Sequence, residues 1–173
     1  MTNETLQTIR SRRSCRAYEP RQITDAALAA VLAAGTYAAS AMGRQSAKSV
    51  GVQDAATRAQ LTRMIAAVMG ADSDPMYGAP TILVVLADAH ANCAVQDGSR
   101  VRGNLMLAAA SLGLGSCWSN RAREEFDSAE GKALLKKWGI EGDWIGVGHC
   151  ILGYPAAEPK PAAPRKPDYI VRV

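Results

Sequence analysis

Hydrophobic positions recur with the period of an α-helix along several stretches of the chain. After Thr24, residues Leu28, Val31 and Leu32 fall on one helical face, and Gly35 follows them. Threonine is a good helix N-cap, and glycine commonly ends helices. The pattern therefore predicts a helix that begins at Thr24 and stops at Gly35.

The same periodicity indicates further helices. One covers residues 54–70, where Asp54 is the cap and Gly70 ends the helix. Its apolar face comprises Leu61, Met64, Ile65 and Val68. Residues 97–112 are apolar almost all round in their later part, which is typical of a central helix. A last helix is expected at residues 128–138.

A short N-terminal helix is predicted around Leu6 and Ile9, with Thr2 or Thr5 as its cap. The apolar run Ile82–Leu86, rich in β-branched residues, predicts a strand buried on both faces. Further strands are expected at residues 48–53 and 146–153, and Cys117 and Trp118 are expected to pack in a strand. The pattern alone indicates one domain of mixed α and β structure.

Composition agrees with a single domain over residues 1–173, because 48% of the residues are hydrophobic and 21% are charged. No apolar run reaches the roughly 20 residues that span a bilayer, and the polar N-terminus is unlike a signal peptide. We therefore expect a soluble cytoplasmic protein without membrane contact.

The cysteines and histidines do not indicate a metal site. The four cysteines contain no Cys-x-x-Cys pair, and there are only two histidines. The thiols are interpreted as small buried or half-buried side chains in a reducing compartment. His149 alternates with apolar residues in the last predicted strand, with no acid nearby in sequence, and is interpreted as a hydrogen-bonded core residue.

The formal charge of +4 is concentrated at the two ends of the chain. Residues 1–50 carry seven Lys and Arg against three acids, and residues 155–173 carry four against two, whereas residues 51–154 are slightly acidic. Aromatic residues make up only 5%, which disfavours a nucleic-acid-binding face of interleaved basic and aromatic residues. This charge distribution fits two basic ends that meet around one small anion better than it fits a nucleic-acid-binding face.

The N-terminal excess is densest in Ser11–Tyr18, with the sequence Ser-Arg-Arg-Ser-Cys-Arg-Ala-Tyr. Guanidinium groups bind phosphate as a fork, and a serine hydroxyl adds a neutral donor. Neighbouring arginines also repel one another unless an anion lies between them. We interpret this stretch as an anion site for a phosphorylated cofactor; the alternative is a solvated basic turn.

Four segments in order resemble those of the FMN-dependent nitroreductase family, in a short form of about 170 residues. Arg12-Arg13-Ser14-x-Arg16-x-Tyr18 resembles its opening signature, and Gly113-Leu-Gly-Ser-Cys-Trp118 is similar to the segment after its central helix. The proline-rich stretch from Gly153 to Lys166 resembles its C-terminal signature. A loop at residues 36–46 matches a family loop at Ser40, Ala41, Gly43 and Gln45, but Ala39, Ser46 and Ala47 depart from it.

The resemblance implies an α+β nitroreductase-like fold, with a central mostly antiparallel sheet surrounded by helices, and an intertwined homodimer that binds FMN at its interface. It implies that the FMN phosphate is bound by Arg12, Arg13, Ser14, Arg165 and Lys166. Arg16 is the catalytic candidate, because a cation beside N1 and the neighbouring carbonyl stabilises reduced flavin.

Two further segments are implied to contact the cofactor. The loop residues that reach the flavin of the other subunit are Ser40, Ala41, Met42, Gly43 and Gln45. The backbone of Ser119 and Asn120 passes the N5 edge of the flavin. Family members often insert helices that roof the site near residues 71–78, and the short segment here predicts an open or differently covered pocket.

The implied activity is reduction of FMN by NADH or NADPH, followed by two-electron transfer to a small nitroaromatic or quinone-type acceptor in ping-pong order. One alternative keeps the fold but changes the chemistry, to flavin destruction, reductive dehalogenation or azoline oxidation. A second is a flavin-binding or redox-sensing protein with little turnover. A third is a small nucleic-acid-binding module, which predicts steeply salt-dependent binding.

Overall fold

The centre of the molecule is a four-stranded sheet in which every pairing is antiparallel. The computed structural model describes residues 1–173. The strand order is β1-β2-β4-β3. The strands are β1 (Ala47–Val52), β2 (Thr81–Asp88), β3 (Gly115–Ser119) and β4 (Trp144–Gly153). The α+β class and the antiparallel sheet are therefore confirmed.

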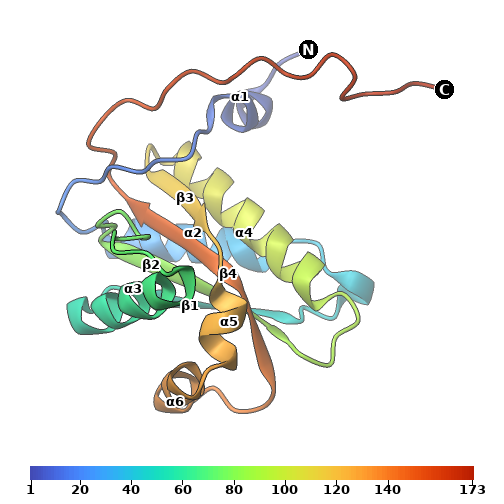
Figure 1. Cartoon of the computed structure of the whole chain (residues 1–173). Coiled ribbons are helices and arrows are strands. Elements are labelled where there is room, and N and C mark those ends of the chain that lie inside the picture. The colour runs from blue at the N-terminus through green and yellow to red at the C-terminus, as the bar shows by residue number, and fades with distance from the viewer.

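Six α-helices surround the sheet (Figure 1). They are α1 (Glu4–Ser11), α2 (Asp25–Thr36), α3 (Ala55–Met69), α4 (Ala94–Ser111), α5 (Ala122–Asp127) and α6 (Ala129–Lys137). A single 3-10 turn, η1 (Ala41–Gly43), interrupts the loop after α2.

Local capping signals explain where most helices begin. The side chains of Thr24, Asp54 and Ser128 accept hydrogen bonds from the backbone of α2, α3 and α6, as predicted. Gly70 ends α3 in the left-handed conformation. The predicted cap of α1 was wrong, because Asn3, rather than Thr2 or Thr5, accepts from the Leu6 N–H.

Several predicted boundaries were also wrong. Gly35 does not stop α2, which continues to Thr36. A Cβ at residue 35 would lie 2.7 Å from Leu105 of α4, so this glycine serves close helix packing instead. Helix α4 begins at Ala94 rather than at residue 97, and the short helix α5 was not predicted.

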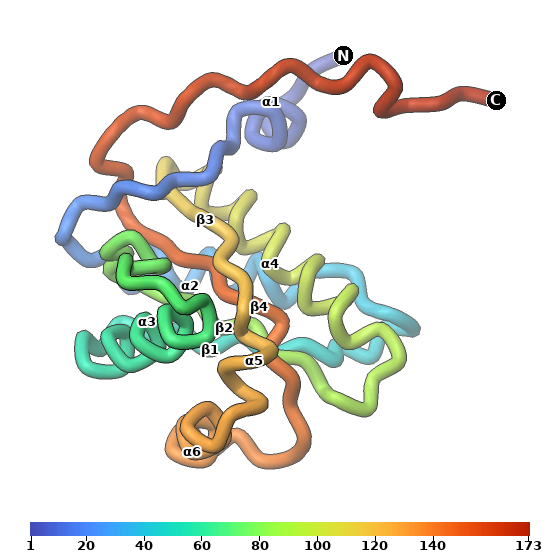
Figure 2. Tube along the Cα trace, in the orientation of Figure 1, coloured from blue at the N-terminus to red at the C-terminus, as the bar shows by residue number.

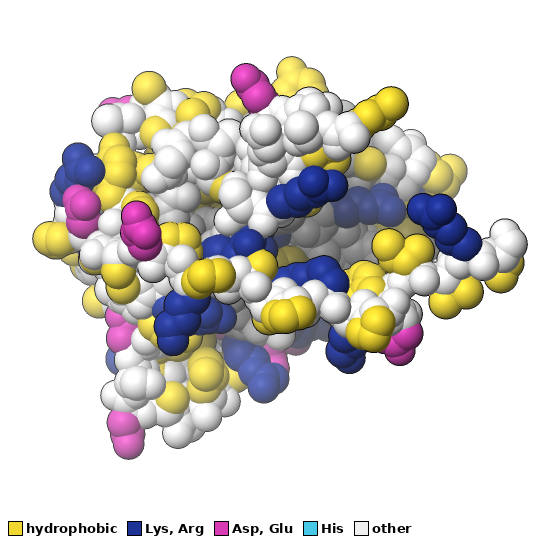
Figure 3. All heavy atoms as spheres, turned by 90° about the horizontal axis from the view of Figure 1, so that it is seen from above, with side chains coloured by type: hydrophobic (Ala, Val, Ile, Leu, Met, Phe, Trp, Pro, Cys, Tyr) yellow, Lys and Arg dark blue, Asp and Glu magenta, His cyan; other side chains and the backbone are white.

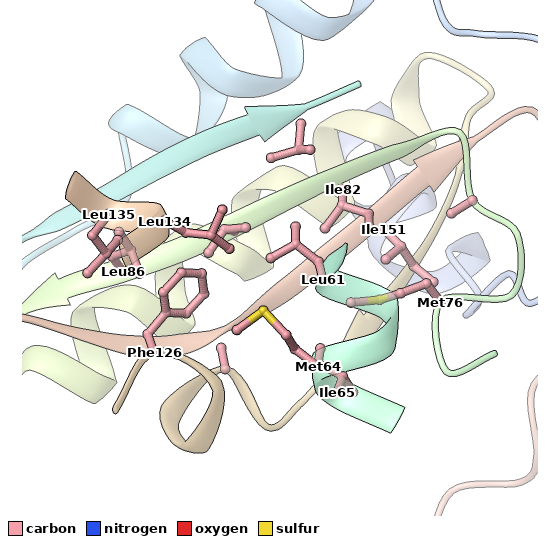
Figure 4. Close-up of a cluster of buried hydrophobic side chains, with 14 of the residues drawn as sticks. Leu61, Met64, Ile65, Met76, Ile82, Leu86, Phe126, Leu134, Leu135 and Ile151 are labelled. Atoms are coloured by element: carbon pink, nitrogen blue, oxygen red, sulfur yellow. The ribbon is translucent and has the colours of Figure 1, made fainter. Parts of the chain in front are cut away.

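The sheet separates two hydrophobic clusters. One cluster lies against α3, α5 and α6 and includes Leu61, Ile65, Phe126 and Ile151 (Figure 4). The other lies against α2 and α4 and includes Val31 and Leu105. Val68 was predicted on the buried face of α3 but is 41% exposed, in the last turn of the helix.

The two ends of the chain run beside each other at the end of the sheet where β3 begins (Figures 1 and 2). Ser14 pairs with Ser116 of β3, and Tyr18 pairs with Pro155. The Ala156 N–H also donates to the Ala17 carbonyl at 3.0 Å. The topology thus brings together the two basic ends that are far apart in sequence.

Residues 71–80, between α3 and β2, contain turns and no helix, as the shortness of this segment indicated. None of the helices combines the length and the apolar character required to cross a bilayer.

Candidate functional site

A cavity of about 710 Å³ lies where the two chain ends meet. Its walls are residues 11–17, the turn from the end of α4 into β3, and the tail from Pro155 to Lys160. Its charged lining residues are the cations Arg12, Arg13, Arg16 and Lys160 and the single acid Glu158. Figure 3 views this end of the molecule and shows Lys and Arg side chains around a hollow. The cavity is therefore suited to an anion.

Some of the N–H donors of the arginines in this cavity have no hydrogen-bond acceptor. Arg13 donates through Nη1 to the carbonyls of Arg10 and Arg12 at 2.7 and 2.6 Å, which satisfies acceptors at the end of α1. The Nη1 of Arg12 and the Nε of Arg13 are buried without any hydrogen-bond partner. Because buried donors are normally satisfied, these two groups indicate a missing acceptor.

The segment that carries these arginines is anchored to β3. The Cys15 N–H donates to the Ser116 carbonyl at 2.9 Å, and the Tyr18 hydroxyl donates to the Cys15 carbonyl at 2.8 Å. Burial raises the pKa of Tyr18, so its hydroxyl stays protonated and remains a donor. A Cβ at Gly115 would lie 2.7 Å from the Cys15 Sγ, so only glycine permits this close approach.

These residues fit a phosphate group. Two unused guanidinium donors, the nearby Ser14 hydroxyl and a mostly cationic wall offer the donors that a phosphate dianion requires. Arg16 also lines the cavity, and its side chain is exposed without a protein partner. The predicted cluster of Arg12, Arg13, Ser14 and Arg16 is thus brought into one place.

The tail contributes a different cation from those predicted. Lys160 lines the cavity, whereas Arg165 and Lys166 are exposed further along the tail and outside its lining. Arg165 donates to the Ala163 carbonyl at 2.7 Å. Sequence reasoning missed Lys160, whose only signal was its place in the basic, proline-rich tail.

The predicted loop at Ser40–Gln45 lies far from this cavity within the same chain. Its anchor is Asp97 near the start of α4, whereas the cavity contacts Ala110 near the end of α4. Thirteen residues of helix separate these positions by about 20 Å. One subunit therefore does not bring the loop and the arginine cluster together.

Asp97 holds this loop in place. Its buried carboxylate accepts from the Ala41 N–H at 3.0 Å and from the Ser46 hydroxyl at 2.8 Å. Met42, Gly43 and Gln45 all have positive φ values, a conformation that non-glycine residues adopt only at a cost. Met42 is 84% exposed, so the loop presents this side chain outward.

Ser119 and Asn120 lie at the far end of β3 from the cavity. From Gly115 to Ser119 the strand extends about 13 Å. The Ser119 carbonyl accepts from Nη1 of Arg102 at 3.3 Å, and Asn120 is exposed. β3 thus connects the cationic cavity to the predicted N5-contact segment.

His149 is buried as predicted, but the interpretation of a hydrogen-bonded residue was wrong. Its Nε2 lies 2.8 Å from Oε2 of Glu125, yet neither ring nitrogen and neither carboxylate oxygen has a partner with hydrogen-bond geometry. Both side chains are fully buried. Sequence reasoning missed Glu125, because it lies on the unpredicted helix α5.

Comparison with known proteins identifies the family of this fold and site. The model of the nitroreductase family matches residues 9–73 and 67–154. A protein of Archaeoglobus fulgidus, provisionally named an NADH dehydrogenase/NAD(P)H nitroreductase, is 35% identical over 161 residues, which cover 90% of this chain and 87% of that protein.

Two solved structures share the whole fold. A nitroreductase with bound FMN from Bacteroides fragilis superposes with a TM-score of 0.90 at 32% identity, covering 99% of this chain and 100% of the other. A nitroreductase with bound FMN from Desulfitobacterium hafniense gives a TM-score of 0.89 at 26% identity, with both chains covered completely. The chain therefore belongs to the nitroreductase family.

Proposed function

We propose that the protein is an FMN-dependent NAD(P)H oxidoreductase that reduces nitroaromatic or quinone-type acceptors by two-electron ping-pong transfer. The observation that carries this proposal is the cationic cavity with its two buried, unpartnered guanidinium donors. The FMN bound by the two similar nitroreductases supports it. The name of the Archaeoglobus relative supports NADH or NADPH as the electron donor.

Arg12, Arg13 and Ser14 would hold the phosphate of FMN, and Lys160 would add positive charge from the tail. We include Arg165 and Lys166 as further phosphate ligands, which requires the exposed tail to fold down over the cofactor. The anchoring of this segment to β3 keeps the donors in position before the ligand arrives, which reduces the entropic cost of binding.

When bound, FMN supplies the two-electron carrier between the nicotinamide and the acceptor. Arg16 provides a positive charge in the cavity, which would stabilise negative charge at N1 and the neighbouring carbonyl of the ring. The backbone of Ser119 and Asn120 would line the N5 edge. The cavity contains no histidine, and solvent supplies the protons.

We further propose that the active form is a homodimer. The Ser40–Gln45 loop lies about 20 Å along α4 from the cavity of its own chain, so it serves the site of a second copy. Ser40, Ala41, Met42, Gly43 and Gln45 are the residues that would contact the partner's flavin. Exposed apolar residues at Tyr169–Val173 are consistent with burial against such a partner.

The first experiment is the visible spectrum of the purified protein with added FMN, followed by anaerobic titration with NADH and NADPH. A bound flavin that bleaches with either nicotinamide supports the proposal. Absence of flavin binding would refute it. Bound flavin that bleaches but is reoxidised slowly by every acceptor would instead favour a flavin-binding or redox-sensing protein with little turnover.

The phosphate assignment is tested by comparing FMN with riboflavin, which lacks the phosphate. We expect Arg12→Ala to weaken FMN binding by about 10- to 100-fold and to leave riboflavin binding unchanged. Arg21→Ala is the control, because Arg21 pairs with Glu19, stacks over the Tyr154 ring and does not line the cavity. Equal losses for both ligands would show that Arg12 does not bind the phosphate.

A further inference from the structure

Arg102, in the middle of α4, is a buried cation without a counter-ion. The residue is 1% exposed, and no carboxylate pairs with it. Burial lowers the pKa of its guanidinium to about 9, so the group still carries its charge at neutral pH. An uncompensated buried charge is costly for a fold, and native proteins seldom retain one without a use for it.

The guanidinium lies against β3 and β4, next to Trp118 and Gly148. Its central carbon is 3.1 Å from the centre of the Trp118 ring. A Cβ on Gly148 would lie 1.3 Å from Nη1, so the guanidinium occupies the space that any other residue at this position would need. The planar guanidinium thus packs against the Trp118 ring and against the backbone of Gly148, where no side chain is in its way.

Most of the five N–H donors of Arg102 are unused. Nη1 donates to the Ser119 carbonyl at 3.3 Å, which is the only hydrogen bond of the side chain. Nε is buried without a partner. Nε and Nη2 form the side of the guanidinium that binds a carboxylate with two parallel hydrogen bonds. The unused side of Arg102 therefore matches a carboxylate.

Trp118 is the part of this arrangement that reaches solvent. Its side chain is 41% exposed, whereas Arg102 beneath it is almost completely covered. An exposed indole offers a surface on which an aromatic ligand can stack. A ligand with both an aromatic ring and a carboxylate would use the indole and the guanidinium together.

The position of Arg102 connects it to the cationic cavity. β3 begins at Gly115 in the cavity and reaches Ser119, the partner of Arg102, after about 13 Å. The charges of Arg102 and Arg12 both lower the pKa of Cys150 against the larger opposite effect of burial, so both guanidiniums act on this one buried thiol. Arg102 therefore lies further along β3 than the phosphate end, outside the lining of the cavity itself.

We propose that Arg102 and Trp118 form a recognition subsite for aromatic carboxylates, which selects acceptors that carry a negative charge. The proposal rests on the proposed oxidoreductase function, in which the backbone of Ser119, the hydrogen-bond partner of Arg102, would line the N5 edge of the flavin. The carboxylate pairs with Nε and Nη2 of Arg102 after the indole of Trp118 has moved off the guanidinium, and the displaced indole stacks on the aromatic ring of the ligand. The subsite narrows the acceptor class from nitroaromatics in general to nitroaromatic acids.

The first test compares two acceptors, 4-nitrobenzoate and the neutral 4-nitrobenzamide, by the ratio of their kcat/KM values. Comparing this ratio between variants cancels the intrinsic difference in reactivity. We expect Arg102→Met to lower the ratio of benzoate to benzamide by about tenfold or more, because a charge-assisted pair is lost. Arg123→Met is the control, because it removes the same charge from an exposed side chain that pairs with Asp127.

The second test does not need turnover. Benzoate and benzamide are titrated into flavin-free protein while tryptophan fluorescence is recorded. We expect a saturable change with benzoate only, which Arg102→Met abolishes. The chain has three tryptophans, so Trp118→Phe shows whether the fluorescence change comes from Trp118. If neither acceptor is turned over, the oxidoreductase function fails, and the fluorescence titration still decides the subsite.

The stability of the Arg102→Met variant shows whether Arg102 recognises a ligand or only supports the fold. Replacing an unpaired buried charge by an apolar side chain is often neutral or stabilising, so we expect Arg102→Met to keep or raise the urea midpoint. A large loss of stability with an unchanged acceptor ratio would show that Arg102 only supports Ser119. An equal effect of Arg123→Met on the ratio, or no fluorescence response to benzoate, would also overturn the proposal.

Discussion

Gly148→Ala is the substitution whose effect the structure defines most sharply. Gly148 lies in β4 with φ of +153°, which L-residues rarely adopt. The new Cβ would lie 1.3 Å from Nη1 and 2.3 Å from Cζ of Arg102. Two separate costs therefore arise, one from the backbone conformation and one from the steric clash with the guanidinium.

Each cost has an expected size. The backbone conformation should cost about 1–3 kcal/mol for a residue with a Cβ. Overpacking against Arg102 should add about 1–3 kcal/mol, since the guanidinium is held between Trp118 and β4. The total is a large fraction of the stability of an average domain, about 5–15 kcal/mol.

The assay is urea unfolding followed by circular dichroism. Gly148→Ala is measured in the wild-type background and again in the Arg102→Ala background, as a double-mutant cycle. We expect the second background to recover the steric part, about 1–3 kcal/mol, and to retain the backbone part. An alanine tolerated within about 0.5 kcal/mol, or a cost that is equal in both backgrounds, would refute this reasoning.

Three further predictions follow from buried polar groups. Asp97→Ala should cost about 2–4 kcal/mol in urea unfolding and make the loop around Met42 sensitive to proteolysis, because two buried hydrogen bonds are lost. Asp97→Asn should retain part of this stability, and equal losses would contradict the role of the side-chain acceptor. Glu125→Ala should destabilise the fold by about 1–3 kcal/mol, because it removes the carboxylate that faces the buried imidazole of His149. The double variant Glu125→Met with His149→Leu should recover most of this loss, and a double variant no more stable than Glu125→Ala would contradict the explanation. At pH 8 a thiol reagent should modify only Cys93 in the native protein, since the other three thiols are buried and burial raises the pKa of Cys150 to about 12. Rapid reaction of a second thiol would contradict this expectation.

The sequence by itself determined the features that depend on neighbouring residues. Thr24, Asp54 and Ser128 cap their helices because a cap bonds to a backbone group only three residues ahead. The run Ile82–Leu86 indicated a central strand, since both faces of that strand are apolar. The arginine cluster at residues 12–16 was visible for the same reason, because its members are adjacent in the chain.

Only the tertiary structure decided which distant residues meet. Lys160 reaches the N-terminal arginines because the tail runs beside the N-terminal segment, and this follows from the pairing of Tyr18 with Pro155. Glu125 meets His149 and Arg102 meets Trp118 through the packing of α5 and α4 on the sheet. No local pattern marks such partners, because sheet register and helix packing depend on the whole core. The local signals thus identified the elements and the anion-binding segment, whereas long-range packing completed the cavity and buried Arg102 without a counter-ion.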